Sequence, residues 1–383
     1  MRVALGGSAV VGVAFGMARY AYGLTLPDVR AEFDLSELLV ALVASGTFAG
    51  YLVGLVAVPR LSARRGPRAP TTVGGVCGAV GATAVALAPT PWVLALGAVI
   101  SGSAAGWVWA PYSDIVTRIA PRPDRPVLLA AITTGTSVGL AGLGALGLLG
   151  LLTSWRVTWA GIAAAAAAVT IANLRAVPRL DADRTRDEEP RSLWRRALIG
   201  PLTYAVLYFA AITAYFTYAT DAARSGGLGA WSAPLLFAVI GLGGLAGLGT
   251  GAMARTVGTA TVAIASVHLV GVALVLLGLG RGSLLLTLVS ALLLGTGFMV
   301  GSSLLAIWTG AAVPDRPGDA FTSALVVGAL VSIATPAAMG AAIPSVGLPT
   351  VLVTAALVTA VGVTSLAAPP LRRQVAPGQE ARR

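Results

Sequence analysis

Arg19 is an isolated charge inside a long apolar stretch, sixteen residues after that stretch begins at Val3. An arginine near the centre of a bilayer costs roughly 2.5–3.5 kcal/mol on insertion scales, so this side chain should face protein or water. Its planar fork of donors suits an anionic group, which it can bind with two hydrogen bonds. The alternative is a structural arginine held by backbone carbonyls or by a carboxylate such as Asp28.

Four tyrosines share a second apolar stretch at helical spacing. Tyr204, Tyr208, Tyr215 and Tyr218, with Ala211 between them, follow steps of 4, 3, 4 and 3 residues, which places them on one helical stripe. Phenol rings can stack on a ligand while their hydroxyls donate hydrogen bonds. The pattern predicts a wall of a binding cavity, and packing between helices is the alternative. An interfacial aromatic belt would account for the outermost ring only.

Four further side chains could line the same path. Tyr22 follows Arg19 at a spacing of three residues and shares its helical face. Trp109 and Tyr112 lie in the fourth apolar stretch and Ser302 lies in the tenth. Only some of them can point inward, because neighbouring positions of a helix face different directions. We predict a substrate site formed by these residues with Arg19 and the tyrosines.

Metal and cofactor sites are not predicted. His268 is the only histidine, so it cannot form a metal cluster by itself. Cys77 is the only cysteine, which permits no intrachain disulfide. The carboxylates are scattered or gather between residues 181 and 189, and none occupies the middle of an apolar stretch.

The composition is typical of an integral membrane protein. Hydrophobic residues make up 56% and charged residues 11%, against about 25% charged in soluble domains, and the mean hydropathy is +0.85. We expect an all-α polytopic membrane protein whose 48 glycines allow close helix packing. Twelve stretches approach or exceed the ~20 residues that a spanning helix needs: 3–26, 37–58, 71–88, 92–113, 127–151, 157–177, 197–222, 231–253, 259–279, 283–309, 319–342 and 347–368.

The charge distribution predicts the orientation. The net charge is +11 and all 26 basic residues are arginines. Twenty-one of them fall at the amino end, in the loops after even-numbered stretches, or in the tail. The positive-inside rule then predicts cytoplasmic termini. We also expect the protein to lie in the cell's inner membrane. No basic patch with interleaved aromatic residues is left over for nucleic acid.

A short repeat indicates an internal duplication. The letters PDRP occur at residues 123–126 and 314–317, half the chain length apart and six stretches apart. Because six is even, both halves must cross the membrane in the same sense, as parallel repeats do. We therefore predict two parallel six-helix halves, 1–177 and 197–370, joined by a charged cytoplasmic linker, 178–196, and followed by a cytoplasmic tail, 371–383.

Several segments resemble one branch of a transporter superfamily. GMARYAYGLTLPDVRAEF, SGTFAGYLVG, RLSARRGPR and SWRVTW look like the YbfB/YjiJ-like branch of the major facilitator superfamily (MFS). The specific matches lie mainly in the first half, whereas the general likeness covers nearly the whole chain. The resemblance implies the MFS fold, with helices one, four, seven and ten around the substrate path.

The loop between the second and third stretches carries the gating motif that the resemblance implies. Arg64, Gly66 and Arg68 match the usual G-x-x-x-D-R-x-G-R-R-like pattern, while Ala63 occupies its acidic position. The resemblance thus implies a gating role for these three residues without the usual ion pair. Asp114, at the end of the fourth stretch, is a further candidate for a gate or a helix cap.

The sequence therefore predicts a secondary active transporter of a small molecule, anionic or aromatic, working as a monomer by alternating access. No G-x-x-x-x-G-K-[ST] motif is present, so the energy should come from a gradient, with protons as the expected coupling ion. Ala98 stands where helix four of the family usually carries an arginine, so that residue's proton-relay role cannot be transferred. The alternatives are a membrane enzyme acting on a lipid-linked substrate and a sensor that transports nothing.

Overall fold

The computed structural model describes residues 2–121, 124–182, 196–314 and 317–367, and every regular element within these ranges is a helix. The first part of the chain contains α1 (Arg2–Val11), the π-helical segment η1 (Gly12–Ala18), α2 (Ala21–Phe33), α3 (Glu37–Arg65), α4 (Arg68–Ala86), α5 (Pro91–Ile119), α6 (Arg125–Leu151) and α7 (Trp155–Ala176). The second contains η4 (Arg196–Leu198), α8 (Ile199–Ser225), α9 (Ser232–Gly244), η5 (Leu245–Gly249), α10 (Thr250–Val257), α11 (Thr259–Leu279), α12 (Leu284–Ala312), α13 (Pro317–Val346), α14 (Leu348–Thr364) and η6 (Ser365–Ala367).

The predicted all-α membrane fold is confirmed. In the described residues, eleven helical stretches are long and apolar enough to cross a membrane, and α14 is a shorter apolar helix of 17 residues. Two of the eleven are interrupted helices. The first crossing, Val3–Phe33, joins α1, η1 and α2, and the eighth, Ser232–Val257, joins α9, η5 and α10.

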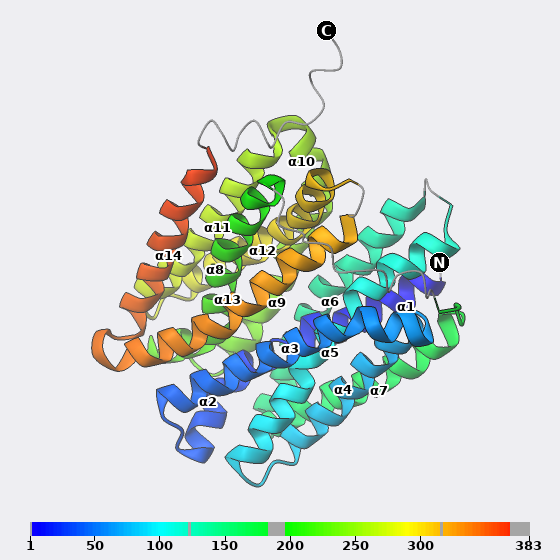
Figure 1. Cartoon of the computed structure of the whole chain (residues 1–383). Coiled ribbons are helices and arrows are strands. Elements are labelled where there is room, and N and C mark those ends of the chain that lie inside the picture. The colour runs from blue at the N-terminus through cyan, green and yellow to red at the C-terminus, as the bar shows by residue number, and fades with distance from the viewer. Residues whose placement is uncertain (1, 122–123, 183–195, 315–316, 368–383) are drawn as a thin grey trace.

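The helices pack as two groups that also contact each other. In the first group α5 packs on α3 and α4, and α4 packs on α7. The second group repeats the scheme, since α12 packs on α9 and α11, and α11 packs on α14. The groups meet where α3 contacts α13, α6 contacts α9 and α2 contacts α8 (Figure 1). The boundaries 1–177 and 197–370 stay a prediction, and linker residues 183–195 and the tail 371–383 lie outside the described residues.

The chain crosses back and forth, so the turns fall at two ends of the bundle. We call the end with the start of α1 the terminus face, and the end with the turns α2–α3, α4–α5, α6–α7, α8–α9, α11–α12 and α13–α14 the far face. Figure 1 shows the α2–α3 and α13–α14 turns at the lower left, away from α1. Hydroxyl caps start several far-face helices. For example, the Ser36 Oγ accepts a hydrogen bond from the Leu39 amide at 3.3 Å.

Glycines bring the first crossing against α6. A Cβ at Gly12 would lie 2.7 Å from the Gly135 carbonyl oxygen, and one at Gly16 would lie 2.6 Å from the Thr136 oxygen. Only glycine allows backbones to approach this closely. The contact holds the π-helical segment in place and thereby positions the residue that follows it, Arg19.

Candidate functional site

A small cavity lies between the two groups of helices. Its volume is about 20 Å³, roughly the space of one water molecule. Both halves supply its walls, so a movement of one half against the other changes its size. The lining residues are Phe15, Arg19, Tyr20, Tyr51, Trp109, Thr133 and Thr136 from the first half and Tyr208, Phe209, Phe298, Met299, Ser302 and Leu325 from the second.

Arg19 lies at the end of the π-helical segment and is only 5% exposed. Its amide donates to the Ala14 carbonyl at 3.2 Å, five residues back, which is the widened π-helical turn. Such turns often occur at functional sites. The Arg19 Nε and Nη1 atoms are buried without a hydrogen-bond partner. Asp28, the carboxylate considered as a structural partner, instead accepts from Arg224 Nη1 at 2.6 Å.

Aromatic rings surround the Arg19 guanidinium. Its Cζ atom lies 4.0 Å from the ring centroid of Tyr51, 5.0 Å from that of Phe48, 5.6 Å from Phe15 and 5.8 Å from Tyr20. These distances are within the range of cation–π attraction. The rings offer negative faces but no full negative charge, so the cation is sheltered without being neutralised.

Most tyrosines of the stripe form hydrogen bonds between helices of the second half. Tyr208 lines the cavity, and its hydroxyl donates to the Phe298 carbonyl. The other three hydroxyls connect α8 to neighbouring helices of its own half: Tyr204 to Ser266 on α11 at 2.8 Å, Tyr215 to Ser290 on α12 at 2.9 Å, and Tyr218 to the Pro336 carbonyl on α13 at 3.2 Å. The stripe thus fastens α8 within the second half.

Two other predicted residues also lie away from the cavity. The Tyr22 hydroxyl donates to the Val40 carbonyl at 3.1 Å, and the Tyr112 hydroxyl donates to Asn173 Oδ1 at 2.7 Å. Both bonds hold helices of the first half together. Among the predicted substrate residues, the structure thus brings Arg19, Trp109, Tyr208 and Ser302 to one cavity.

Trp109 also contacts the second half. Its ring packs edge-on against Phe321 of α13, with centroids 5.1 Å apart, and against Phe15, 5.3 Å away. The Trp109–Phe321 contact lies between the cavity and the terminus face, because it joins the later part of α5 to the first turns of α13. It forms an aromatic contact between the halves on that side.

The prediction from sequence missed the aromatic residues that come from other helices. Tyr51, Phe209 and Phe298 line the cavity, but nothing in the spacing of their own helices distinguishes them from packing residues. Tyr20 could have been found from the sequence, since it directly follows Arg19. In the structure its ring stacks on Phe216 of α8, with centroids 3.8 Å apart.

Ion pairs join the two halves at the far face. Arg30 on α2 donates through Nη1 to both oxygens of Asp221 on α8, at 2.9 and 3.0 Å, and through Nη2 to Glu37 at 2.9 Å. A second pair joins the same two helices with the charges reversed, since Arg224 lies on α8 and Asp28 lies on α2. We call these contacts the far-face ion pairs.

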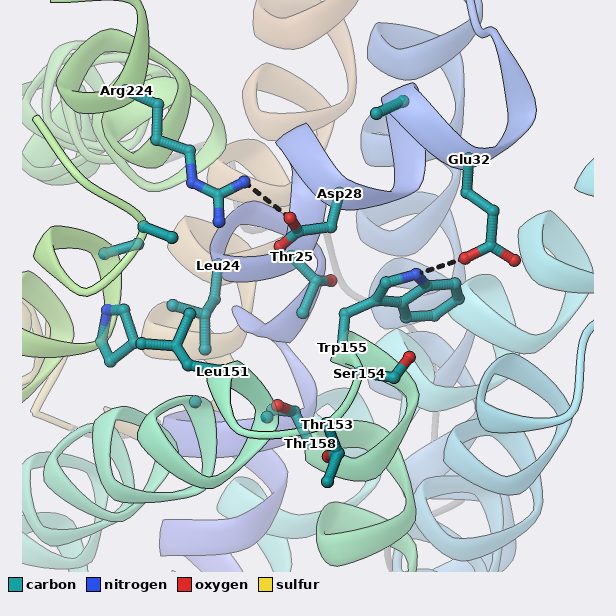
Figure 2. A pocket seen from close by; sticks show the side chains of 16 residues that line it. Leu24, Thr25, Asp28, Glu32, Leu151, Thr153, Ser154, Trp155, Thr158 and Arg224 are labelled. Carbon is teal, nitrogen blue, oxygen red and sulfur yellow. Dashed lines mark hydrogen bonds and ion pairs between the residues drawn. The ribbon is translucent and has the colours of Figure 1, made fainter. Parts of the chain in front are cut away.

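A larger cavity of about 570 Å³ lies beside these ion pairs. Figure 2 shows the Asp28 carboxylate turned toward Arg224, and Glu32 turned toward the indole of Trp155. The Trp155 Nε1 donates to Glu32 at 2.7 Å, and Arg156 donates to the same carboxylate. The SWRVTW segment therefore attaches the start of α7 to the end of α2.

The predicted gating residues lie at the terminus face of the first half. Arg68 Nη1 donates to the carbonyls of Leu174 and Val177, at 3.3 and 3.1 Å, which joins α4 to the end of α7. Gly66 adopts a φ of +78°, a conformation that side chains rarely allow. Arg64 is exposed.

Asp114 also lies at this face, and it pairs with Arg118 one turn further along α5, at 3.3 Å. The pair therefore belongs to one helix end of the first half.

The comparisons with known proteins agree with this architecture. The sequence profile of the Major Facilitator Superfamily matches residues 8–336. A crystal structure of a mutant of the nucleoside transporter NupG shares the fold with a TM-score of 0.75 at 12% identity, covering 95% of this chain and 99% of that one. The xylose transporter XylE from E. coli, in a partially occluded inward-open conformation, gives 0.76 at 14% identity, covering 95% and 96%. No curated protein matches the sequence.

Proposed function

The chain belongs to the major facilitator superfamily, and on that premise we propose that it is a secondary transporter that moves a small organic molecule by alternating access. The observation that carries the proposal is the central cavity, which both halves line and which contains a buried arginine whose Nε and Nη1 atoms have no hydrogen-bond partner. Assignment to the YbfB/YjiJ-like branch stays a prediction.

We propose an anionic substrate with a flat or aromatic body. A carboxylate or similar group could accept the unpaired Arg19 hydrogen bonds, which are stronger when both partners are charged. The aromatic lining suits an apolar body beside that group. Sugar and nucleoside are named for the two similar transporters, but a neutral molecule would leave the arginine charge unmatched.

Alternating access would come from opening one face while the other is closed. At the far face, the ion pairs and the tight approach of Gly23 to the Phe216 backbone hold α2 against α8. Toward the terminus face, the Trp109–Phe321 contact separates the cavity from the end of the bundle. Breaking either set and keeping the other would expose Arg19 to one side only.

Our proposals for orientation, oligomeric state and coupling ion rest on the sequence. We propose that the arginine-rich terminus face is cytoplasmic, in the inner membrane, and that one chain is the working unit. Proton coupling stays a prediction. The described cavity residues include no carboxylate that could take up a proton. The far-face carboxylates are engaged with arginines in this state.

Ligand-induced thermal stabilisation tests the proposal. The purified protein would be screened against matched small anions, cations and neutral compounds, together with Arg19→Gln and the exposed control Arg60→Gln. We expect stabilisation by anions in wild type and Arg60→Gln and none in Arg19→Gln. Compounds that stabilise would then be tested for flux in proteoliposomes. Binding without flux would contradict transport, and equal stabilisation of Arg19→Gln would contradict the anion site.

A further inference from the structure

Resting on the proposed transport function, we infer that the central site is an anion exchanger. The site switches readily between facing one side of the membrane and facing the other only when one singly charged anion neutralises Arg19. Each anion taken up is then matched by one released.

The charges around the cavity are the first reason. Of the described residues that line it, Arg19 is the only ionisable cation and no carboxylate is present. The other polar groups are the hydroxyls of Tyr20, Tyr51, Thr133, Thr136, Tyr208 and Ser302 and the indole N–H of Trp109. Asp28 lies nine residues further along the chain, about 13 Å along a helix, and is held by Arg224. The site therefore carries one unmatched positive charge.

The way Arg19 is held is the second reason. The Tyr51 ring centroid lies 4.0 Å from the guanidinium carbon and that of Phe48 lies 5.0 Å away. The rings shelter the cation, and the hydroxyls of Tyr20 and Tyr51 also interact with it, but these neutral groups supply no negative charge. Nε and Nη1 remain buried and unpartnered. A bound anion would supply both the missing acceptors and the missing charge.

The consequence concerns the empty transporter. The closed cavity has room for roughly one water molecule, so closing over an empty site leaves a buried charge and buried donors unsatisfied. Such groups are costly in a protein interior. With an anion bound, the halves would close around a wider site and bury a neutral, hydrogen-bonded pair. The return step of the empty carrier should therefore be slow, and a second anion on the opposite side should accelerate it.

The single arginine also predicts the substrate's charge. A monoanion makes the occupied site neutral, whereas a dianion leaves one negative charge and a neutral molecule leaves one positive charge. All three could share the same flat body, so charge alone would decide which is carried. One-for-one exchange of monoanions would move no net charge across the membrane.

Three aromatic probes built on the same ring test this inference: benzenesulfonate, benzene-1,3-disulfonate and benzenesulfonamide. The sulfonates stay ionised at every practical pH, so they cannot leak through the bilayer as neutral acids. Uptake of labelled benzenesulfonate into proteoliposomes would be measured with and without unlabelled benzenesulfonate inside. We expect at least about ten-fold faster uptake with the internal anion, no response to an imposed voltage, and poor exchange of the other two probes.

Arg19→Gln is the test variant and Arg60→Gln, which removes an exposed arginine, is the matched control. We expect exchange to be lost in the first and retained in the second, with thermal unfolding confirming that both are folded. Equal uptake into empty and loaded vesicles, or uptake that follows a proton gradient, would overturn exchange and leave the transporter standing. No flux of any probe under any loading would overturn the anion site as well.

Discussion

Arg19 is a buried cation that the protein surrounds with aromatic rings. Each ring contributes about 0.5–2 kcal/mol of cation–π attraction. The effective cost of burying a charge is several kcal/mol, and four rings lie within 6 Å of the guanidinium carbon. The rings can therefore keep the arginine folded into the site. They do not remove its requirement for a negatively charged partner.

Arg19→Lys tests whether the fork of donors matters beyond the charge. Lysine keeps the charge but cannot offer the planar pair of donors. We expect anion affinity to fall roughly 10- to 100-fold, as the loss of a charged hydrogen bond predicts. Isothermal titration with benzenesulfonate would measure it, with Arg60→Lys as the control. An unchanged affinity in Arg19→Lys would contradict binding of the anion by two hydrogen bonds from the guanidinium.

Tyr215→Phe separates packing from ligand binding. It removes the bond to Ser290 and should lower stability by about 0.5–1.5 kcal/mol, seen as a lower unfolding midpoint. Anion affinity should not change, because Tyr215 does not line the cavity. Ser302→Ala should instead lower the anion affinity, since Ser302 lines the cavity. A drop in affinity in Tyr215→Phe equal to that in Ser302→Ala would mean that the tyrosine stripe does line the ligand site.

These residues show what sequence can and cannot predict about a site. Hydropathy alone identified Arg19, because a charge inside an apolar stretch needs an explanation wherever its neighbours lie. The tyrosine spacing correctly defined one face of α8, but periodicity does not say what that face meets. Only the position of α11 and α12 shows that Tyr204 and Tyr215 pack within their own half.

At the level of helices, the far-face ion pairs are of two kinds. One lies within the first half, and the others join α2 to α8. Arg30 pairs with Glu37 of its own half and with Asp221 of the other half. When α2 and α8 part, Arg30 can keep Glu37. Asp221 and Arg224 lie three residues apart on α8, a spacing at which helical side chains can pair. We therefore expect opening of the far face to exchange ion pairs rather than simply to lose them.

Charge reversal tests this arrangement. Asp28→Arg and Arg224→Asp should each favour opening of the far face, and the double variant should restore closure, with a coupling of about 0.5–3 kcal/mol. Distances between spin labels at the far-face ends of α2 and α8 would report the populations. Arg281→Asp, at an exposed far-face position, is the control. Additive effects without rescue would show that the two residues do not act as a pair.

The contact between η1 and α6 makes a separate prediction. Gly16→Ala would place a Cβ 2.6 Å from the Thr136 carbonyl oxygen, so we expect about 1–3 kcal/mol of destabilisation and weaker anion binding through displacement of Arg19. Gly318→Ala is the control, because nothing lies within 4 Å of its added Cβ. Thermal unfolding and anion titration would measure both effects. Equal behaviour of the two variants would contradict the proposed positioning of Arg19 by this contact.

Across the whole molecule, the twelfth predicted stretch forms only the shorter helix α14, while the other eleven crossings were predictable because lipid demands long apolar helices. The breaks at η1 and η5 were not, since composition does not distinguish a π or 3-10 turn from the surrounding helix. The internal repeat carried more information than its short motif suggested. Arg30 and Asp221 lie 191 residues apart, the same offset as the two PDRP copies, and they form an ion pair. Counterpart positions near the axis relating two parallel halves can meet in this way.

The repeated motif itself has a local role in its first copy. Arg125 donates through Nε to the Ala120 carbonyl at 3.0 Å and through Nη2 to the Thr117 carbonyl at 2.7 Å, which satisfies the end of α5. In the second copy, Asp315 and Arg316 lie outside the described residues.

Two-sided access to the central cavity tests the account most directly. Thr136→Cys, made in a Cys77→Ala background, would place a single thiol on the cavity wall. A membrane-impermeant thiol reagent would be added to right-side-out and to inverted vesicles, with exposed Ser113→Cys as a one-sided control. We predict that the thiol introduced by Thr136→Cys reacts from both sides and that benzenesulfonate slows both reactions. Reaction from one side only would contradict a site that opens alternately to each side.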